Sequence, residues 1–247
     1  SEWIDFVMWK LAEKGWKFLV FSAENPIPFH IAKLLEKRVG FSLNDTVSNE
    51  LYEESVRWLD QHFRFFDSTV SSSLDSIFKR AVFMLEEDPG YKGLVIDPFN
   101  YIDPDTSGNT ETQSISNTLT LIHRFAKKYN VHVFICAHPQ KMYRGNGGNI
   151  PEVGPYDING SAAWFNKTDF GISVSRLVED PTMTQIHVWK CRFKWMGEVG
   201  KATLKYDASS GRYEDTFGSV ESLEGIDWSG LGDESEEPSE EQVRIPF

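Results

Sequence analysis

The sequence predicts an α/β fold in which a mostly parallel sheet, flanked by helices, carries an antiparallel hairpin edge. Short apolar segments alternate with amphipathic segments up to about residue 137, and this alternation is typical of parallel strands joined by helices. Three strand-like segments then follow one another without helices between them, which indicates antiparallel pairing. With 247 residues and 40% hydrophobic composition, the chain can bury a sizeable core.

The individual elements follow from periodicity and from its interruptions. Apolar residues from Trp3 to Leu11 recur at three- and four-residue spacing and predict a helix that runs to about Lys14. Gly15 ends this helix, and the apolar run at 17–22 predicts the first strand. The other predicted elements are helices at 28–39, 72–85 and 114–129, buried strands at 93–97 and 131–137, and strands at 171–176, 184–193 and 202–207.

The formal net charge of −12 lies almost wholly near the C-terminus. Residues 214–247 hold eleven acidic residues and one basic residue, Arg244, so residues 1–213 carry a charge of only −2. A nearly neutral domain does not exclude nucleic acid as a partner. The acidic segment is rich in Gly, Ser and Glu and has too few apolar residues to offset its ordering entropy. We therefore expect a folded domain at 1–213 and a disordered acidic tail at 214–247.

Composition also excludes several classes of protein. No run of about 18 apolar residues occurs in the sequence, so neither a transmembrane helix nor a membrane partner is expected. The two cysteines, Cys136 and Cys191, are too few for a disulfide framework or a four-thiolate zinc site. This cysteine usage favours a reducing compartment such as the cytoplasm.

Charged side chains stand directly after several predicted strands. Glu24 follows the first strand, Asp97 ends the strand at 93–97, and His138 follows the strand at 131–137. Lys190 and Arg192 occupy alternate positions near the end of a hairpin strand. Taken singly, these are ordinary residues: a turn or helix-cap Asp, a solvated loop Glu, a hydrogen-bonded core His and a solvated basic face. Together, at the carboxyl ends of a parallel sheet, they predict a site for Mg²⁺ and a polyphosphate ligand.

Five segments carry a family resemblance: SAENP (22–26), LVIDPFNYID (94–103), ICAHPQK (135–141), DINGSAAWFNKTDFGISVSR (157–176) and WKCRFKWMGEVGKATLKYDASSGRYE (189–214). In this order they resemble the C-terminal RecA-like ATPase domain of DnaB-like replicative DNA helicases, and within that family the phage primase-helicases and Twinkle. The last two segments are the most specific. A Gly-Ser-Ala-Ala segment followed by an aspartate, a strand and Lys-x-Arg is rarely assembled by chance. The resemblance covers most of residues 1–214 and implies a RecA-like P-loop NTPase core.

One motif of that family does not occur within these residues. The family binds ATP through Gly-x-x-x-x-Gly-Lys-[Ser/Thr] at the start of its first helix, and the nearest segment, Gly197 to Ala202, lacks the spacing and the hydroxyl. Ser1 opens the first predicted helix, so the resemblance implies that Ser1 ends a P-loop lying just upstream. The 247 residues alone should then bind ATP poorly, whereas the complete protein should hydrolyse it. A relative that has lost the loop is the alternative.

The resemblance also implies roles for residues at the nucleotide site. Ser1 and Asp97 would hold Mg²⁺, Asp97 through a bound water. Glu24 would orient and polarise the attacking water, matching the family pattern in which this carboxylate lies on a neighbouring strand. His138 corresponds to the sensor of the γ-phosphate, and Gln140 is a rival for that role.

A basic pair is implied to act between subunits. Arg192 matches the arginine finger that enters the neighbouring subunit's site, and Lys190 would be its companion. A guanidinium suits this role because its planar, permanently charged fork matches the transition-state oxygens. Because such a finger acts in trans, the resemblance implies a ring as the active form, most simply a hexamer.

Two loops are expected to face DNA in the centre of such a ring. The loop at 103–113 has no basic residue, whereas the loop at 139–159 contains Lys141, Arg144, Asn146 and Asn149 within a Gly-rich stretch. These four residues are the predicted contacts to the backbone of single-stranded DNA. The alternative is a mobile surface loop without that role.

The acidic tail ends in Ile245, Pro246 and Phe247, similar to the tails of single-stranded-DNA-binding proteins and of phage replicative helicases. Such a tail would dock on a replicative polymerase, a primase or a single-stranded-DNA-binding protein. The alternative is a tail that only solubilises.

The leading interpretation is a motor domain that couples ATP hydrolysis to translocation on single-stranded DNA and to unwinding at a replication fork. The expected location is the cytoplasm of a bacterium or of a phage-infected cell. Two alternatives stay open: a RecA-like strand-exchange or clock-type ATPase, and a non-catalytic, ring-forming interaction module.

Overall fold

The computed structural model of the protein describes residues 2–44, 47–66, 69, 71–103, 110–140, 153–154, 156–158 and 161–216. They belong to one compact unit that spans Ser1–Thr216. Several predicted features lie outside the described residues and stay predictions: Ser1, the four DNA-contact residues Lys141, Arg144, Asn146 and Asn149, and the end of the tail at Ile245, Pro246 and Phe247.

The central sheet has four parallel strands in the order β2-β1-β3-β4. The strands are β1 (Lys17–Ser22), β2 (Phe63–Phe66), β3 (Tyr91–Asp97) and β4 (His132–Ile135). From β1 the chain passes to β2 on one side and then returns past β1 to β3 on the other side. The strand order therefore reverses between β1 and β3. In open α/β sheets, ligands bind outside the carboxyl ends of the strands at such a reversal.

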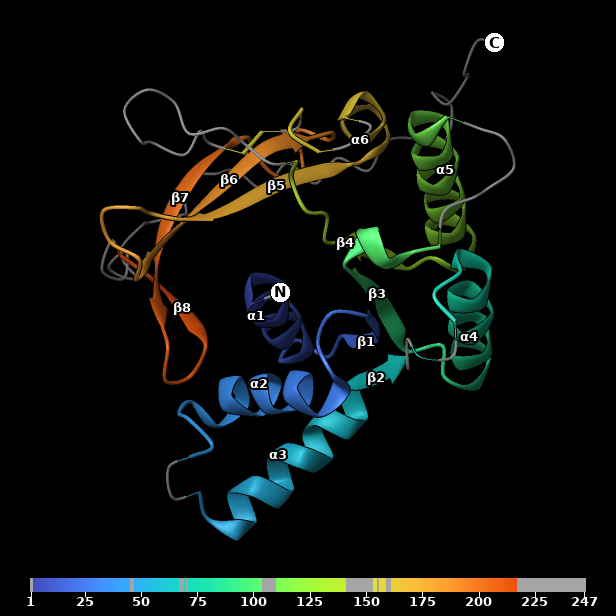
Figure 1. Cartoon of the computed structure of the whole chain (residues 1–247). Coiled ribbons are helices and arrows are strands. Elements are labelled where there is room, and N and C mark those ends of the chain that lie inside the picture. The colour runs from blue at the N-terminus through green and yellow to red at the C-terminus, as the bar shows by residue number, and fades with distance from the viewer. Residues whose placement is uncertain are drawn as a thin grey trace, which may run out of the picture. The chain divides into compact units, whose positions relative to one another are not determined.

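Helices cover both faces of this sheet (Figure 1). On one face lie α1 (Glu2–Ala12), α2 (Ile27–Val39) and α3 (Asn49–His62), and on the other α4 (Leu74–Glu87) and α5 (Glu111–Tyr129). Alternate residues of β1 serve the two cores: Phe18 and Val20 pack with the first group of helices, and Leu19 and Phe21 with the second. Burial on both faces explains why the strand is a continuous apolar run.

The remaining strands form a second sheet of their own, which corrects one detail of the predicted fold. These strands are β5 (Phe170–Arg176), β6 (Met183–Cys191), β7 (Gly200–Asp207) and β8 (Arg212–Asp215), paired antiparallel in chain order. They were predicted as an edge of the parallel sheet, but within the described residues no backbone ladder joins β4 to β5. The ring of His132 in β4 lies 6.2 Å from that of Phe170 in β5 instead. With four residues, β4 offers only a short edge for pairing.

Five elements of the described chain escaped prediction because their sequences are short or polar, and one of them is the three-residue 3₁₀ helix η1 (Phe99–Tyr101). Helix α3 buries only Ser55 and Leu59 of its own residues, so it lacks a broad apolar stripe. The others are β2 and β8, with four residues each, and the seven-residue helix α6 (Ser161–Lys167) before β5. In the described part of the chain, no helix has both the length and the apolar character needed to cross a bilayer.

Candidate active site

The carboxyl ends of β1 and β3 lie side by side at the reversal of the strand order. Ser22, the last residue of β1, pairs in register with Asp97, the last residue of β3. The backbone N–H of Ala23 then donates to the carbonyl oxygen of Asp97 at 2.9 Å. The turn that carries Glu24 is therefore attached directly to the strand end that carries Asp97.

Asp97 is a buried carboxylate at this edge. Its residue is 1% exposed, and within the described part of the chain its Oδ2 atom has no hydrogen-bond partner. By the alternation of β3, Asp97 projects on the same side as Val95, toward the core that holds α1 and α2. Cys136, just after β4, lies against it, and burial together with the negative charge of Asp97 raises the pKa of the Cys136 thiol. The thiol therefore stays protonated beside the carboxylate.

Glu24 and His138 meet at the same edge of the sheet. The Nε2 atom of His138 lies 3.6 Å from Oε2 of Glu24, and the two side chains are 55% and 45% exposed. Two hydrogen bonds hold the segment of His138 to the segment after Asp97: Phe99 N–H donates to the Cys136 carbonyl at 2.7 Å, and His138 N–H donates to Oδ1 of Asn100 at 3.3 Å. Three of the residues predicted from the sequence thus gather at one edge of the sheet.

Arg192 and Lys190 lie elsewhere, at the C-terminal end of α6. The Arg192 guanidinium donates to the carbonyls of Asn166 at 2.9 Å and Thr168 at 3.3 Å and forms an ion pair with Asp169 at 2.9 Å. The Lys190 amine donates to the carbonyl of Phe165. Burial and the positive charge of Arg192 lower the pKa of Lys190, against the opposing effect of Asp169. Cations are favourable here because the carbonyls at a helix C-terminus carry partial negative charge.

Within the described residues, no hydrogen bond or ion pair joins this basic pair to Glu24, Asp97 or His138. The Arg192 side chain is 35% exposed, so it is accessible from solvent. Gln140, the rival sensor, is exposed, and its backbone N–H donates to the carbonyl of Asp157 at 2.6 Å. The chain therefore assembles the acidic half of the predicted site and holds the basic half apart from it.

The donor set at the strand ends fits a magnesium ion bound mainly by phosphate and water. Among the described residues, no group of three or more His, Cys, Asp or Glu side chains is arranged to hold a metal by itself. Mg²⁺ keeps several waters and is usually bound by one or two carboxylates together with substrate phosphates. The buried, unpartnered oxygen of Asp97 matches that requirement.

Sequence reasoning missed the residues that support this site. Asn100 orients the His138 segment, Asp169 holds Arg192, and His30 lies buried between Asp5 and Ser22. Asp169 and Asn100 stand inside the segments that carried the resemblance, so their polar character at those places was a usable signal. The His30 contacts join three separate elements, and no local spacing indicates them.

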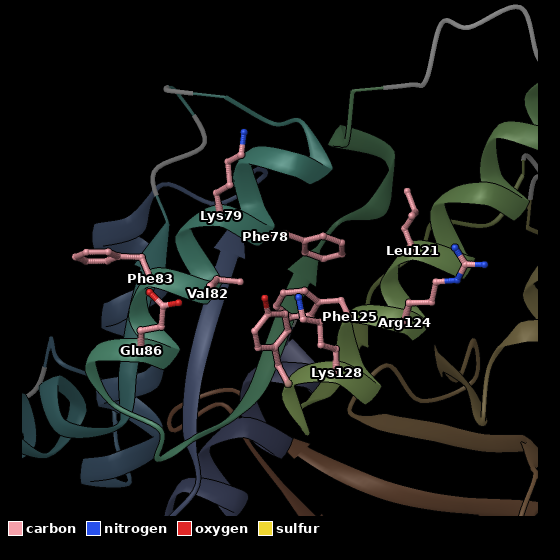
Figure 2. Close-up of a pocket in the computed structure, with 10 residues that line it drawn as sticks. Phe78, Lys79, Val82, Phe83, Glu86, Leu121, Arg124, Phe125 and Lys128 are labelled. Carbon is pink, nitrogen blue, oxygen red and sulfur yellow. The ribbon is translucent and has the colours of Figure 1, made fainter.

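A pocket of about 520 Å³ lies away from these residues, between α4 and α5 (Figure 2). Its floor is apolar, and the charged side chains Lys79, Glu86, Arg124 and Lys128 stand around it. None of the residues predicted for the nucleotide site lines it. It is therefore a separate feature of the outer face and adds nothing to the strand-end site.

The chain is similar in sequence or in structure to several known proteins. No protein-family model matches the chain. A curated relative, "Twinkle homolog protein, chloroplastic/mitochondrial" of Arabidopsis thaliana, is 37% identical over 232 residues, which covers 87% of this chain. The chain spans about a third of that protein's length, 32%. The name of this relative assigns it to chloroplasts and mitochondria, and the cytoplasmic location expected for the present chain stays a prediction.

Solved structures confirm the predicted fold class. The ATPase domain of G40P matches with a TM-score of 0.70 at 15% identity, covering 85% of this chain and 79% of that one. A DnaB-like replicative helicase, solved to show its interactions with primase, matches with a TM-score of 0.72 at 14% identity, covering 87% and 55%. The RadB recombinase matches with a TM-score of 0.53 at 15% identity, covering 86% and 84%. The chain therefore shares the predicted RecA-like fold with these structures, and its predicted resemblance to Twinkle is confirmed by the similarity in sequence.

Proposed function

We propose that this chain is the motor domain of a replicative DNA helicase, which hydrolyses ATP or another nucleoside triphosphate to move along single-stranded DNA and unwind duplex. The observation that carries the proposal is the in-register pairing of Ser22 with Asp97, which sets Glu24, Asp97 and His138 on one edge of the sheet. The 37% identity to a Twinkle homologue supports the same function.

Each residue at this edge has a distinct task in the proposed reaction. Asp97, through a bound water, and the hydroxyl of Ser1 would hold Mg²⁺, which would neutralise charge on the phosphates when bound. Glu24 orients and polarises the attacking water, because its carboxylate is 45% exposed and follows the strand end that pairs with Asp97. His138 contacts the γ-phosphate from its place beside Glu24, and Gln140 is the alternative for this contact.

The basic pair completes the site of a neighbouring subunit. Arg192 is the arginine finger and Lys190 its companion, and both are held on α6, apart from the Glu24 cluster of the same chain. A residue that does not reach its own site can act on a second copy, so the active form is a ring, most simply a hexamer. Fingers of this type contribute roughly 10³–10⁵ in rate.

The remaining contacts are proposed from the sequence. Lys141, Arg144, Asn146 and Asn149 contact the phosphate backbone of single-stranded DNA, and each contact repeats in every subunit of a ring. Ile245, Pro246 and Phe247 dock on a partner at the fork, either a polymerase, a primase or a single-stranded-DNA-binding protein.

The test is single-strand-stimulated hydrolysis by the full-length gene product that contains these 247 residues. Glu24→Gln keeps the shape of the side chain and removes its basicity, so we expect the turnover number to fall by about 10²–10⁴ while nucleotide binding persists. Glu50→Gln makes the same change on the exposed first turn of α3 and should leave the rate unchanged.

Two results would contradict the proposal. Glu24→Gln with the rate of Glu50→Gln would remove Glu24 from the reaction. Strong DNA-stimulated hydrolysis without unwinding of a forked substrate would favour the strand-exchange or clock-type alternative, which shares the fold.

A further inference from the structure

A polar chain runs through the core directly beneath the Glu24 turn. Asp5 of α1, Ser22 of β1 and His30 of α2 are 0%, 3% and 0% exposed. The Nε2 atom of His30 lies 2.6 Å from Oδ1 of Asp5, and its Nδ1 atom lies 3.1 Å from the hydroxyl of Ser22. The imidazole therefore bridges the first helix of the chain to the last residue of β1.

The Ser22 hydroxyl extends this chain into the turn itself. It donates to the backbone carbonyl of Asn25 at 3.2 Å, on the far side of Glu24. The near side is held as well, because the N–H of Ala23 donates to the Asp97 carbonyl. Both flanks of Glu24 are thus fixed by hydrogen bonds, and one of them continues into the core.

The number of hydrogens available determines which group donates in each of these hydrogen bonds. A carboxylate only accepts, so Nε2 of His30 must donate to Asp5. A serine hydroxyl has one hydrogen, and when Asn25 receives it, the Ser22 oxygen can only accept from Nδ1–H of His30. With the Ser22–Asn25 bond made, the ring donates on both sides, to Asp5 and to Ser22.

The surroundings of Asp5 favour its charged form. Burial by itself would raise the pKa of Asp5, but the hydrogen bond from His30 and the positive charges of His30, Lys33 and Lys37 outweigh it, so the pKa is lowered. The amine of Lys33 lies 3.4 Å from the second oxygen, Oδ2. Both oxygens of the carboxylate thus have a donor.

We propose that Asp5, His30 and Ser22 are positioning residues, which form a hydrogen-bond relay that fixes the Glu24 turn relative to α1. This inference rests on the proposed function, in which Glu24 orients the attacking water. The relay matters because a displacement of about 1 Å in a reacting group can cost about 10²-fold in rate. Its three members are buried beneath the surface, so it acts through the turn.

The first test separates positioning from general packing. Ser22→Ala in the full-length gene product removes the link between His30 and Asn25 and leaves the Asp5–His30 pair in place. We expect single-turnover hydrolysis at saturating ATP to slow by about 10–100-fold with KM for ATP unchanged. Ser55→Ala is the matched control, because Ser55 is 1% exposed, lies in α3, and has a hydroxyl with no hydrogen-bond partner in the described structure.

Two results would overturn the relay. One is equal rates of hydrolysis by Ser22→Ala and Ser55→Ala, whether both variants are slowed or neither is. The other is a slowing by Ser22→Ala that is accompanied by an equal rise in KM for ATP. Glu24→Gln is run beside them. If Glu24→Gln hydrolyses ATP normally, the proposed function of that residue fails, independently of the relay.

A second test does not depend on activity. Long-range ¹⁵N–¹H spectra of the chain labelled at histidine report which ring nitrogens carry hydrogen, and His30→Gln identifies the His30 signals. We expect hydrogen on both nitrogens of His30, with the Nε2 proton shifted far downfield by Asp5. A His30 ring whose Nδ1 lacks hydrogen would mean that the Ser22 hydroxyl points at the ring and away from Asn25, and the relay would be wrong.

Discussion

Two clusters of charged side chains in this molecule are stabilised in different ways. At the β1–β3 edge, Asp5 and His30 are fully buried, Asp97 is nearly so, and the partners of the first two are ionisable or hydroxyl side chains. At the end of β6, Arg192 is 35% exposed and bonds mainly to main-chain carbonyls of the α6 end, with Asp169 as its one ion-pair partner in the described residues.

The two clusters therefore differ in how easily their side chains can change partners. A buried pair resists any change, because removing one partner leaves an uncompensated charge in the core. An exposed ion pair contributes only about 0–1 kcal/mol, so Arg192 can leave Asp169 at little cost and bind a stronger partner. The β1–β3 edge is accordingly preorganised, whereas the basic pair can leave its present partners for the second copy on which we propose that it acts.

The largest expected effect comes from Arg192→Ala, which should slow hydrolysis by roughly 10³–10⁵-fold in the full-length protein. Lys194→Ala removes an exposed charge two residues further along and should have little effect. Mixing Arg192→Ala with Glu24→Gln subunits should restore part of the activity, because some interfaces then combine a normal Glu24 with a normal Arg192.

If rings proven to contain both variants recovered no hydrolysis, a role for Arg192 in the neighbouring subunit's site would be contradicted. Arg192 would then act within its own chain or not at all, and its distance from the Glu24 cluster would have no functional meaning.

A smaller effect is expected from Asp5→Asn, which should lower the free energy of unfolding at pH 7 by about 3–5 kcal/mol. The pKa values of Asp5 and Glu2 are lowered in the fold by the basic groups around them, although burial opposes this. Their contribution is therefore complete above the pKa of the unfolded carboxyls, about 4, and is lost as the pH falls through the lower values of the folded state. Urea unfolding at pH 7 and pH 3 measures it.

Asp88→Asn is the matched control for that experiment. Its pair with Lys17 is short, 2.6 Å, but both side chains are more than a third exposed. We expect a loss of about 1 kcal/mol or less. Equal losses of unfolding free energy for Asp5→Asn and Asp88→Asn would show that the buried cluster stabilises the fold no more than the exposed ion pair does.

A smaller loss of stability than that of Asp5→Asn is expected for a change of Arg212 in the antiparallel sheet. Arg212 in β8 donates through Nε and Nη2 to the carbonyl of Lys37 at the end of α2, at 2.9 and 2.7 Å, and lies 4.5 Å from the ring centre of Trp9. Arg212→Ala should lower stability by about 1–3 kcal/mol, because charged hydrogen bonds to buried carbonyls are lost. Lys205→Ala on the exposed side of β7 is the control in thermal unfolding. A collapse of hydrolysis in Arg212→Ala, with stability unchanged, would contradict this structural role.

The sequence was most informative where periodicity and burial agree. Strand β1 was predicted with its exact bounds, and β3 to within two residues at its start, because both are apolar runs that are covered on both faces. The carboxyl-end rule then located Glu24, Asp97 and His138. Helix α3 was not predicted, because only two of its residues are buried and it therefore lacks a broad apolar stripe.

The sequence does not show how separate segments pair and pack against one another. The β5–β8 strands form a sheet of their own, and no pattern within 170–215 indicates this. His30 reads as one polar residue in an amphipathic helix, and only the folded chain shows Asp5 and Ser22 on its two nitrogens. Contacts that join three elements need the tertiary structure.

The strand order also bears on how the molecule folds. Ser22 and Asp97 are paired although 75 positions separate them, whereas β5, β6 and β7 pair with strands that follow closely along the chain. Local hairpins form early, and contacts between distant segments form late because closing a long loop costs entropy. The edge that carries Glu24 and Asp97 therefore arises only once β1 and β3 have paired across this long loop. The proposed binding of nucleotide at this edge would then report that pairing, and chains in which it had not yet formed would be unable to hydrolyse their substrate.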